Sequence, residues 1–206
     1  MPYDVTRKFE SEVAAYAGAK YGVAVESGTA AIFLSLYRRW WERGGIEEVE
    51  IPARTYPSVA CSIIHWGGRP IFIQDGWLDG SVYVLKPLDI VDGALSFRRG
   101  MYRGGLHCLS FHVKKLLPIG RGGMILTDDE ETYRWLKKAR FDGRDECDLN
   151  RDSFSMLGFN MYMTPEQAAR GLQLFSIIRN STKDPADLVV SEQGYPDLSQ
   201  YEVYRR

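Results

Sequence analysis

The chain has 206 residues, of which 45% are hydrophobic and 26% are charged, so it can bury one sizeable core and is expected to form a single domain. Its net charge of −1 gives no general attraction to nucleic acid, and no apolar run approaches the length of a membrane span. The three cysteines lack the paired spacing of a zinc or redox site, so we expect no metal. Their odd number and the lack of a signal peptide favour a cytoplasmic protein.

Helical and strand patterns alternate along most of the chain. Helices are predicted over residues 7–17, 30–41, 57–66, 129–140 and 164–178. Strands are predicted over residues 21–25, 48–51, 70–73 and 123–127. Gly18 is a normal stop for the first helix, and Thr164 followed by Pro165 is a normal start for the last. The alternation is typical of an α/β fold, and the charged stretch 141–157 is expected to be a long loop.

Two short apolar runs in the middle of the chain, 82–85 and 88–91, are separated by only two residues. Parallel neighbours in a sheet need a crossover connection of about a dozen residues or more. The two runs cannot be joined in that way. Either they are not parallel neighbours, or one of them is not a strand.

A predicted strand, a tight turn and a predicted helix surround Ser27, Gly28 and Thr29. The first amides of a helix have no partner within the helix, and the helix dipole adds partial positive charge there. A phosphate group can therefore bind at Gly28 and Thr29. The alternative is an ordinary helix cap provided by Ser27 or Thr29.

Asp92 ends the second of the two apolar runs and is followed by the small residues Gly93 and Ala94. A carboxylate at the end of a buried strand is costly to desolvate unless a cation or hydrogen-bond donors meet it. A protonated pyridine ring is one such cation. The alternative is an aspartate that caps a turn or the following helix.

Lys114 and Lys115 follow Ser110, Phe111 and His112 and precede a glycine-rich turn. A lysine amine held just after a buried strand can form a Schiff base with an aldehyde cofactor, provided that burial or a nearby positive charge lowers its pKa. Lys114 could supply that charge to Lys115. The alternative for the pair is a solvated loop. His112 either lines the same site or is a polar residue at a strand end.

The order of these three segments along the chain resembles the DegT/StrS-type sugar aminotransferases, which are fold type I enzymes that use pyridoxal phosphate. The resemblance covers most of residues 8–178 and implies an α/β fold: the reduced large domain of that class, with a mostly parallel sheet flanked by helices and the small C-terminal domain missing. Besides the three segments, it is carried by Phe9, Glu10, Tyr16, Gly18, Tyr21, Val23, Ala30, Pro52, Ala53, Thr55, Tyr56, Gly68, Pro70, Ile71, Phe72, Asp75, Thr127, Asp128, Glu130, Gly158, Asn160, Met163, Gln167, Ala168, Ala169, Gly171 and Leu174.

The resemblance implies that Lys115 and Asp92 are the catalytic residues. Lys115 follows Ser110 by five residues and precedes Gly120 by five, which is the family's spacing for the Schiff-base lysine. Asp92 would face the pyridine nitrogen and keep it protonated, so that the ring accepts electrons when the substrate loses a proton. The implied activity is a pyridoxal-phosphate-dependent aminotransferase that moves an amino group from an amino-acid donor to a keto sugar linked to a nucleotide.

The remaining matches imply cofactor contacts and a dimer. Tyr56 matches the aromatic residue that stacks on the cofactor ring, and Gly28, Thr29 and Ser110 match the groups that hold the phosphate. Asn160 matches an asparagine that reaches into the partner subunit's phosphate site. The resemblance therefore implies a homodimer with shared active sites.

We expect residues 1–179 to form a compact pyridoxal-phosphate-binding domain and residues 180–206 to form an extended or disordered tail. The chain is little more than half the usual family length, and Leu95 stands where the family has a polar residue near the cofactor. These departures leave open a non-catalytic or weakly active dimeric remnant that binds the cofactor. Elimination or racemisation on the same cofactor is a further alternative, although Lys115 argues against the dehydratase branch, in which histidine replaces that lysine.

Overall fold

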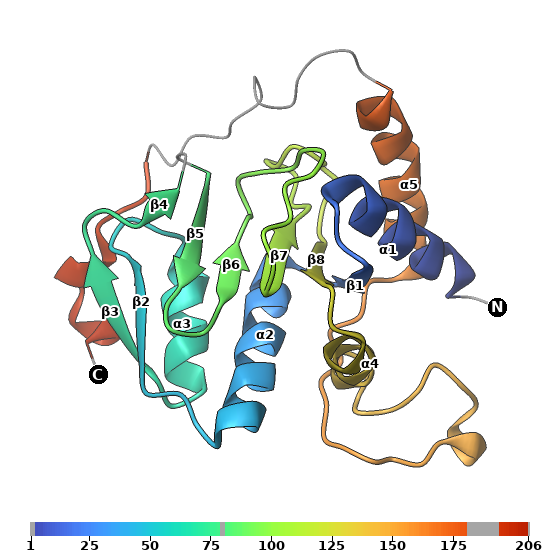
Figure 1. The fold of residues 1–206 in the computed structure, drawn as a ribbon, viewed down its shortest axis with the longest axis horizontal. Coiled ribbons are helices and arrows are strands. Elements are labelled where there is room, and N and C mark those ends of the chain that lie inside the picture. The colour runs from blue at the N-terminus through green and yellow to red at the C-terminus, as the bar shows by residue number, and fades with distance from the viewer. Residues whose placement is uncertain (1–2, 79–80, 181–193, 206) are drawn as a thin grey trace.

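The computed structural model of the chain describes residues 3–78, 81–180 and 194–205. Its helices are α1 (Asp4–Ala17), α2 (Gly28–Arg43), α3 (Pro57–His65), α4 (Glu130–Ala139) and α5 (Pro165–Arg179), as Figure 1 shows. Its strands are β1 (Tyr21–Val25), β2 (Glu48–Pro52), β3 (Arg69–Ile73), β4 (Trp77–Leu78), β5 (Val82–Leu85), β6 (Ile90–Asp92), β7 (Leu106–Ser110) and β8 (Gly123–Thr127). Three short 3-10 helices complete the described elements: η1 (Leu149–Arg151), η3 (Leu198–Gln200) and η4 (Glu202–Tyr204).

The predicted helices are confirmed as α1 to α5, and the local signals at their ends act as expected. Gly18 ends α1 in a left-handed conformation with φ of +88°, and its N–H donates to the carbonyl groups of Ala14 and Ala15. Thr164 and Gln167 form a reciprocal capping box at the start of α5, where Pro165 is the first helical residue.

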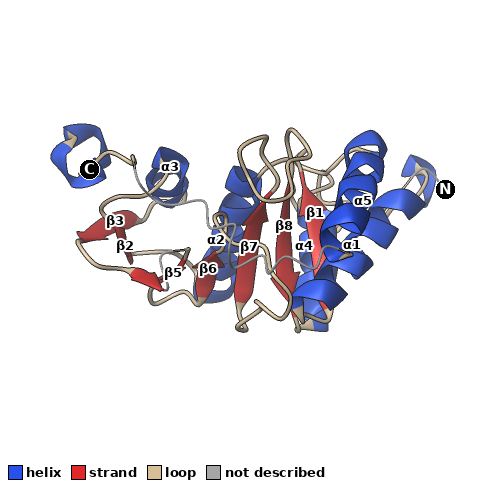
Figure 2. Cartoon of the chain, turned by 90° about the horizontal axis from the view of Figure 1, so that it is seen from above, coloured by secondary structure: helices blue, strands red, loops and turns tan. Residues whose placement is uncertain are grey.

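The strands form one six-stranded sheet in the order β1-β8-β7-β6-β5-β4 and a parallel pair, β2-β3. In the six-stranded sheet only β6 and β7 pair in parallel, and the other four pairs are antiparallel. The expected α/β class is confirmed, but the expectation of a mostly parallel sheet is wrong, because β8 and β5 each run against both of their neighbours. An isolated bridge between Glu50 and Lys86 joins β2 to the residue that follows β5. Figure 2 shows the β2-β3 pair on the β5 side of the six-stranded sheet.

The two short apolar runs are both strands, β5 and β6, and they pair in antiparallel fashion. Only residues 86–89 connect them, which is too short for a parallel crossover. The sequence-based exclusion of a parallel connection is therefore confirmed. The register places Tyr83 of β5 directly opposite Asp92 of β6, so the Tyr83 hydroxyl group lies close to the Asp92 carboxylate.

Helices cover both faces of the sheet and divide the core into two apolar clusters. Residues of α2, α3 and α4 belong to one cluster, and residues of α1 and α5 belong to the other. Side chains alternate between the clusters along β1 and β8: in β8, Ile125 packs into the first, whereas Met124 and Leu126 pack into the second. Within the described ranges, no helix is both long and apolar enough to cross a bilayer.

The described end of the chain, residues 194–205, folds back onto the domain. Leu198 is 1% exposed, and its N–H donates to the carbonyl group of Ala53 at 2.8 Å. Arg54 and Asp197 form an isolated bridge beside this bond. This part of the chain is therefore packed against the domain, and the expected division into a domain over residues 1–179 and an extended or disordered tail stays a prediction. Residues 181–193 and 206 of that expected tail lie outside the described residues.

Candidate active site

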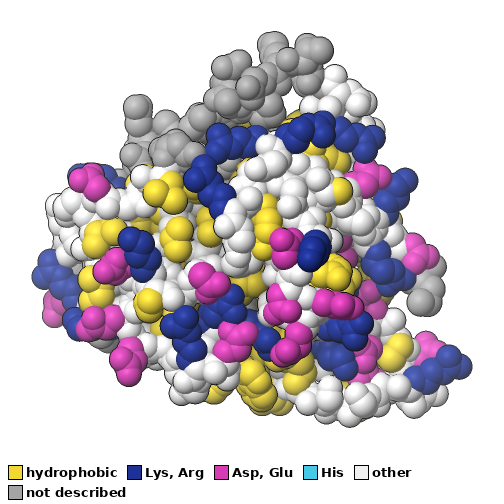
Figure 3. Space-filling view, in the orientation of Figure 1, with side chains coloured by type: hydrophobic (Ala, Val, Ile, Leu, Met, Phe, Trp, Pro, Cys, Tyr) yellow, Lys and Arg dark blue, Asp and Glu magenta, His cyan; other side chains and the backbone are white. Residues whose placement is uncertain are grey.

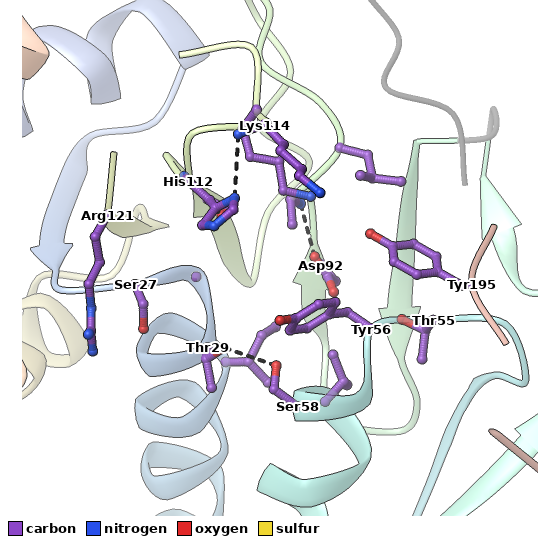
Figure 4. Close-up of a pocket in the computed structure, with 18 of the residues that line it drawn as sticks. Ser27, Thr29, Thr55, Tyr56, Ser58, Asp92, His112, Lys114, Arg121 and Tyr195 are labelled. Carbon is purple, nitrogen blue, oxygen red and sulfur yellow. Dashed lines mark hydrogen bonds between the residues drawn. The ribbon is translucent and has the colours of Figure 1, made fainter. Parts of the chain in front are cut away.

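A cavity of about 340 Å³ lies at the carboxyl ends of β6 and β7, beside the N-termini of α2 and α3 (Figure 4). It is lined by six of the seven residues predicted for the site: Gly28, Thr29, Tyr56, Asp92, Ser110 and Lys115. The seventh, Asn160, does not line it. The tertiary structure therefore brings together residues from four separate stretches of the chain.

Asp92 is the acidic group of the cavity. It is 7% exposed, and one carboxylate oxygen, Oδ1, accepts a hydrogen bond from the Ala94 N–H at 2.9 Å. The other oxygen, Oδ2, accepts one from the Tyr83 hydroxyl at 2.8 Å. Because Tyr83 has only one hydroxyl proton, Thr55 must donate to Tyr83 across their 2.7 Å contact. The chain from Thr55 through Tyr83 fixes the orientation of the carboxylate.

Lys115 lies in a tight loop that follows β7. The Phe111 N–H donates to the carbonyl group of Gly122 at 2.8 Å, and the Lys115 N–H donates to that of His112 at 2.9 Å. Gly120 has a φ of +120°, a backbone conformation that L side chains rarely adopt. The glycine-rich turn therefore allows the loop to close and hold the lysine at the cavity.

Burial favours the neutral forms of both Lys115 and Asp92. It lowers the pKa of Lys115, and the negative charge of Asp92 opposes that shift. Burial also raises the pKa of Asp92, against the opposing effects of the Ala94 N–H, the Tyr83 hydroxyl and the charge of Lys115. The lysine pKa is thus lowered by burial rather than by Lys114, which we had expected to contribute its charge. The pair therefore consists of an amine that can lose its proton and a carboxylate whose charged form a nearby cation would stabilise.

The N-terminus of α2 meets the end of β7 at one side of the cavity. Ser27 caps the helix, since its Oγ accepts a hydrogen bond from the Ala30 N–H at 3.0 Å, so the cap alternative is confirmed for Ser27. A Cβ atom on Gly28 would lie 2.8 Å from the Cβ of Ser110, so the close approach of helix and strand requires glycine. The first-turn amides of Gly28 and Thr29 and the Ser110 hydroxyl can together hold an anion.

Tyr56 and Asn160 are both exposed, but they lie in different places. Tyr56 is 57% exposed, precedes α3 and lines the cavity. Asn160 lies on the segment between α4 and α5, and its Nδ2 donates to Oδ2 of Asp142 at 3.2 Å. In the described part of the chain, Asn160 is not among the residues that line the cavity. Its expected contact with a partner subunit stays a prediction.

Several residues of the cavity were missed by sequence reasoning. His112, for which the sequence left open either a place at the site or a polar position at a strand end, does line the cavity. Tyr195 was missed because it is far from the rest of the site in sequence. Tyr83, which does not line the cavity but bonds to Asp92, was missed because its role depends on strand register. The additional lining residues are Ser27, Ile32, Thr55, Ser58, Val59, Trp77, Ala94, Leu95, Lys114, Arg121, Gly122 and Tyr195. Among the residues that the structure describes, no group of three or more His, Cys, Asp or Glu side chains could hold a metal.

Sequence comparison identifies the family. The profile of the DegT/DnrJ/EryC1/StrS aminotransferase family matches residues 1–90 and 98–184. The chain therefore belongs to this family, as the order of its motifs indicated.

Three curated relatives illustrate the match. The spore coat polysaccharide biosynthesis protein SpsC of Bacillus subtilis (strain 168) is 28% identical over 219 residues, with 81% of this chain and 55% of SpsC covered. A UDP-N-acetyl-3-dehydro-alpha-D-glucosamine 3-aminotransferase of Acidithiobacillus ferrooxidans is 37% identical, with 79% and 54% covered. The GDP-perosamine synthase of Caulobacter vibrioides is 27% identical, with 80% and 54% covered. The chain spans about half the length of the curated relatives it matches.

Solved structures share the fold. The aminotransferase TlmJ from Streptoalloteichus hindustanus superposes with a TM-score of 0.72 at 19% identity, covering 85% of this chain and 59% of TlmJ. DesV from S. venezuelae, solved in complex with a ketimine intermediate, superposes with a TM-score of 0.69 at 21% identity, covering 85% of this chain and 57% of DesV. At these identities the likeness concerns the fold.

Proposed function

We propose that this chain binds pyridoxal phosphate and transfers an amino group from an amino-acid donor to a keto sugar linked to a nucleotide. The observation that carries the proposal is the meeting of a half-buried lysine, a buried carboxylate and a helix N-terminus in one cavity. The names of two relatives, a GDP-perosamine synthase and a UDP-sugar 3-aminotransferase, support a sugar nucleotide as the class of acceptor.

The residues of the cavity fit the chemical groups of the cofactor. Asp92 offers a buried carboxylate to the protonated pyridine nitrogen, and Lys115 offers an amine to the aldehyde. The Gly28 and Thr29 amides and the Ser110 hydroxyl suit the phosphate. The volume of about 340 Å³ lies within the range of roughly 300–1,000 Å³ that is usual for small-molecule sites.

Each of these residues then has a role in the reaction. When bound, pyridoxal phosphate supplies an electron sink for the carbon that loses a proton. Asp92 holds the proton on the ring nitrogen, and the hydroxyl groups of Tyr83 and Thr55 hold Asp92 in place. The Lys115 amine would take up and return a proton at the substrate carbon, because burial lowers its pKa. Tyr56 would stack on the ring.

We also propose that the functional unit is a homodimer in the cytoplasm. Asn160 is exposed and does not line the cavity of its own chain, which fits a residue that serves the partner subunit's phosphate site. The family supports this arrangement, and the three cysteines, which are all free in this fold, are compatible with a reducing compartment.

Covalent trapping tests the cofactor site. Purified protein given pyridoxal phosphate is expected to develop an absorption band in the near-visible, and borohydride is expected to fix the cofactor to Lys115. Lys115→Ala should abolish the label, whereas Lys114→Ala, the matched neighbour in the same loop, should retain it. Peptide mapping by mass spectrometry locates the label. A label on Lys114, or no label, would contradict the assignment.

A separate assay tests the activity. Protein loaded with pyridoxal phosphate and not treated with borohydride is supplied with glutamate or glutamine and a nucleotide-linked keto sugar, and the amino sugar is detected by mass spectrometry. Amine transfer that is lost in Lys115→Ala supports the aminotransferase. Labelling at Lys115 without transfer to any keto sugar would favour the alternative, a non-catalytic or weakly active cofactor-binding protein.

A further inference from the structure

The described end of the chain contributes a residue to the candidate site. Tyr195 lines the cavity together with Asp92, Lys115 and Tyr56. Its ring lies 6.3 Å from that of Tyr56, measured between centroids, and the two planes meet at 70°. Figure 4 shows Tyr195 on the opposite side of Asp92 from Thr29, with its hydroxyl group directed into the cavity.

Tyr195 is held in place by the loop between β2 and α3. The Arg54 guanidinium donates to the carbonyl oxygen of Tyr195 at 3.1 Å, and the Leu198 N–H donates to that of Ala53 at 2.8 Å. The Leu198 side chain is buried in the same apolar cluster as α2 and α3. The same loop carries Thr55 and leads into Tyr56, so Tyr195 is fixed relative to the rest of the site.

The Tyr195 hydroxyl is a hydrogen-bond donor at neutral pH. Burial raises its pKa, and the negative charge of Asp92 and the neighbouring Tyr56 raise it further. The phenol therefore keeps its proton. A donor that faces a ligand site from a fixed position needs an acceptor on the ligand.

The substitution pattern of the cofactor identifies that acceptor. In pyridoxal phosphate the aldehyde and the ring nitrogen lie at opposite ends of the ring, and the phosphate arm and the phenolic oxygen flank the aldehyde on opposite sides. The line from Lys115 to Asp92 would set the direction of the ring from its aldehyde to its nitrogen. The phosphate would bind at Gly28 and Thr29, on one side of that line. The phenolic oxygen is then directed to the other side, where Tyr195 lies.

We propose that the Tyr195 hydroxyl donates a hydrogen bond to the phenolic oxygen of the bound cofactor, which makes Tyr195 a positioning residue. This inference rests on the proposed cofactor site. With the cofactor bound to Lys115, a proton would be shared between the phenolic oxygen and the Lys115 nitrogen. A hydrogen bond from Tyr195 would draw electron density from the phenolic oxygen, so the oxygen would hold this proton less strongly. Tyr195 therefore lowers the pH at which the absorption band of the bound cofactor changes.

The test compares Tyr195→Phe with Tyr201→Phe in the full chain loaded with pyridoxal phosphate. Tyr195→Phe keeps the ring and removes only the hydroxyl. We expect it to raise the midpoint of the spectral pH titration by about one unit and to weaken cofactor binding about tenfold, as for the loss of one hydrogen bond. Tyr201 is 50% exposed on the same segment and does not line the cavity, so Tyr201→Phe should change neither quantity.

The outcomes separate this inference from the proposed function. If both variants are labelled at Lys115 and share the wild-type midpoint and affinity, Tyr195 makes no such bond and the inference is overturned, while the cofactor site stands. If the wild-type protein takes up no cofactor at Lys115, both proposals are overturned. Thermal unfolding of each variant checks that the phenylalanine substitutions leave the fold intact.

Discussion

At the scale of single residues, His107 is the most unusual buried group outside the cavity. It lies on β7 with no exposed surface, and neither ring nitrogen has a hydrogen-bond partner in the described part of the chain. A Cβ atom on Gly93 would lie 2.4 Å from its Nε2, so the ring fills the space behind the turn that follows Asp92. Burial, aided by the positive charge of Arg103, lowers the pKa of His107 to about 4.

This shift predicts a pH-dependent stability. The unfolded chain binds a proton at His107 near pH 6.5, whereas the folded chain binds it only near pH 4. The contribution of neutral His107 to the free energy of unfolding is therefore complete above pH 6.5. As the pH falls toward 4, the free energy of unfolding decreases by about 3 kcal/mol in total, because the unfolded chain takes up the proton first. We expect His107→Leu to remove this part of the decrease in the free energy of unfolding, measured by urea denaturation at pH 7, 6, 5 and 4. Equal pH slopes in both proteins would contradict the prediction.

At the scale of elements, a buried ion cluster joins α1, β1, α4 and the loop 141–157. Glu10 and Arg140 are 3% and 1% exposed and pair directly, and Glu10 also accepts the Ala24 N–H at 2.9 Å. Arg140 also pairs with Glu146 of the loop at 2.8 Å. Lys137 pairs with Glu10 at 3.1 Å and with Glu146 at 2.9 Å. Although burial alone would raise it, the charges of Lys137 and Arg140 hold the pKa of Glu146 below its ordinary value.

Removing the Arg140 guanidinium from this cluster should be costly. Arg140→Met leaves the Glu10 carboxylate buried with fewer donors, so we expect a loss of about 3–5 kcal/mol in the free energy of unfolding. Arg134→Met on the same helix breaks only the exposed pair with Glu130 and should cost about 0–1 kcal/mol. Chemical denaturation measures both. Similar losses in the two variants would show that the buried cluster does not anchor these elements.

At the scale of the whole molecule, exposed apolar side chains on and beside the loop 141–157 suggest where the proposed dimer forms. Leu149 and Phe154 are both 61% exposed, and Leu157 is 83% exposed, three residues before Asn160. Large apolar side chains in solvent commonly mark a contact surface when they gather in one region. If Asn160 reaches a partner's site, the residues beside it must lie at the interface.

Substitution at Leu157 tests this arrangement. Leu157→Asp would bury a charge at the proposed interface, so we expect a shift from dimer toward monomer in light scattering coupled to gel filtration. Ile177→Asp is the matched control, because Ile177 is 66% exposed on α5 and should leave the dimer intact. A wild-type protein that is monomeric at micromolar concentration, or a dimer insensitive to Leu157→Asp, would contradict the proposal.

The predictions from sequence succeeded where the physical cause is local. β1 and β8 begin and end at the predicted residues, since a short apolar run bounded by turn residues needs no distant partner to be recognised. Gly18, Ser27 and Thr164 end or begin helices through bonds to residues within four positions. The spacing from Ser110 to Lys115 and Gly120 likewise lies within one segment of the chain, and the lysine that it indicated does line the cavity.

By itself, then, the sequence determined the family, the order of elements and most residues of the candidate site. The tertiary structure alone decided how the strands pair, and so that the sheet is mixed and that Tyr83 stands opposite Asp92. It also brought Tyr195 to the cavity beside residues more than 100 positions away. The reason is physical: capping and turn formation depend on neighbours along the chain, whereas strand pairing and burial depend on which distant segments remove the most apolar surface from water together.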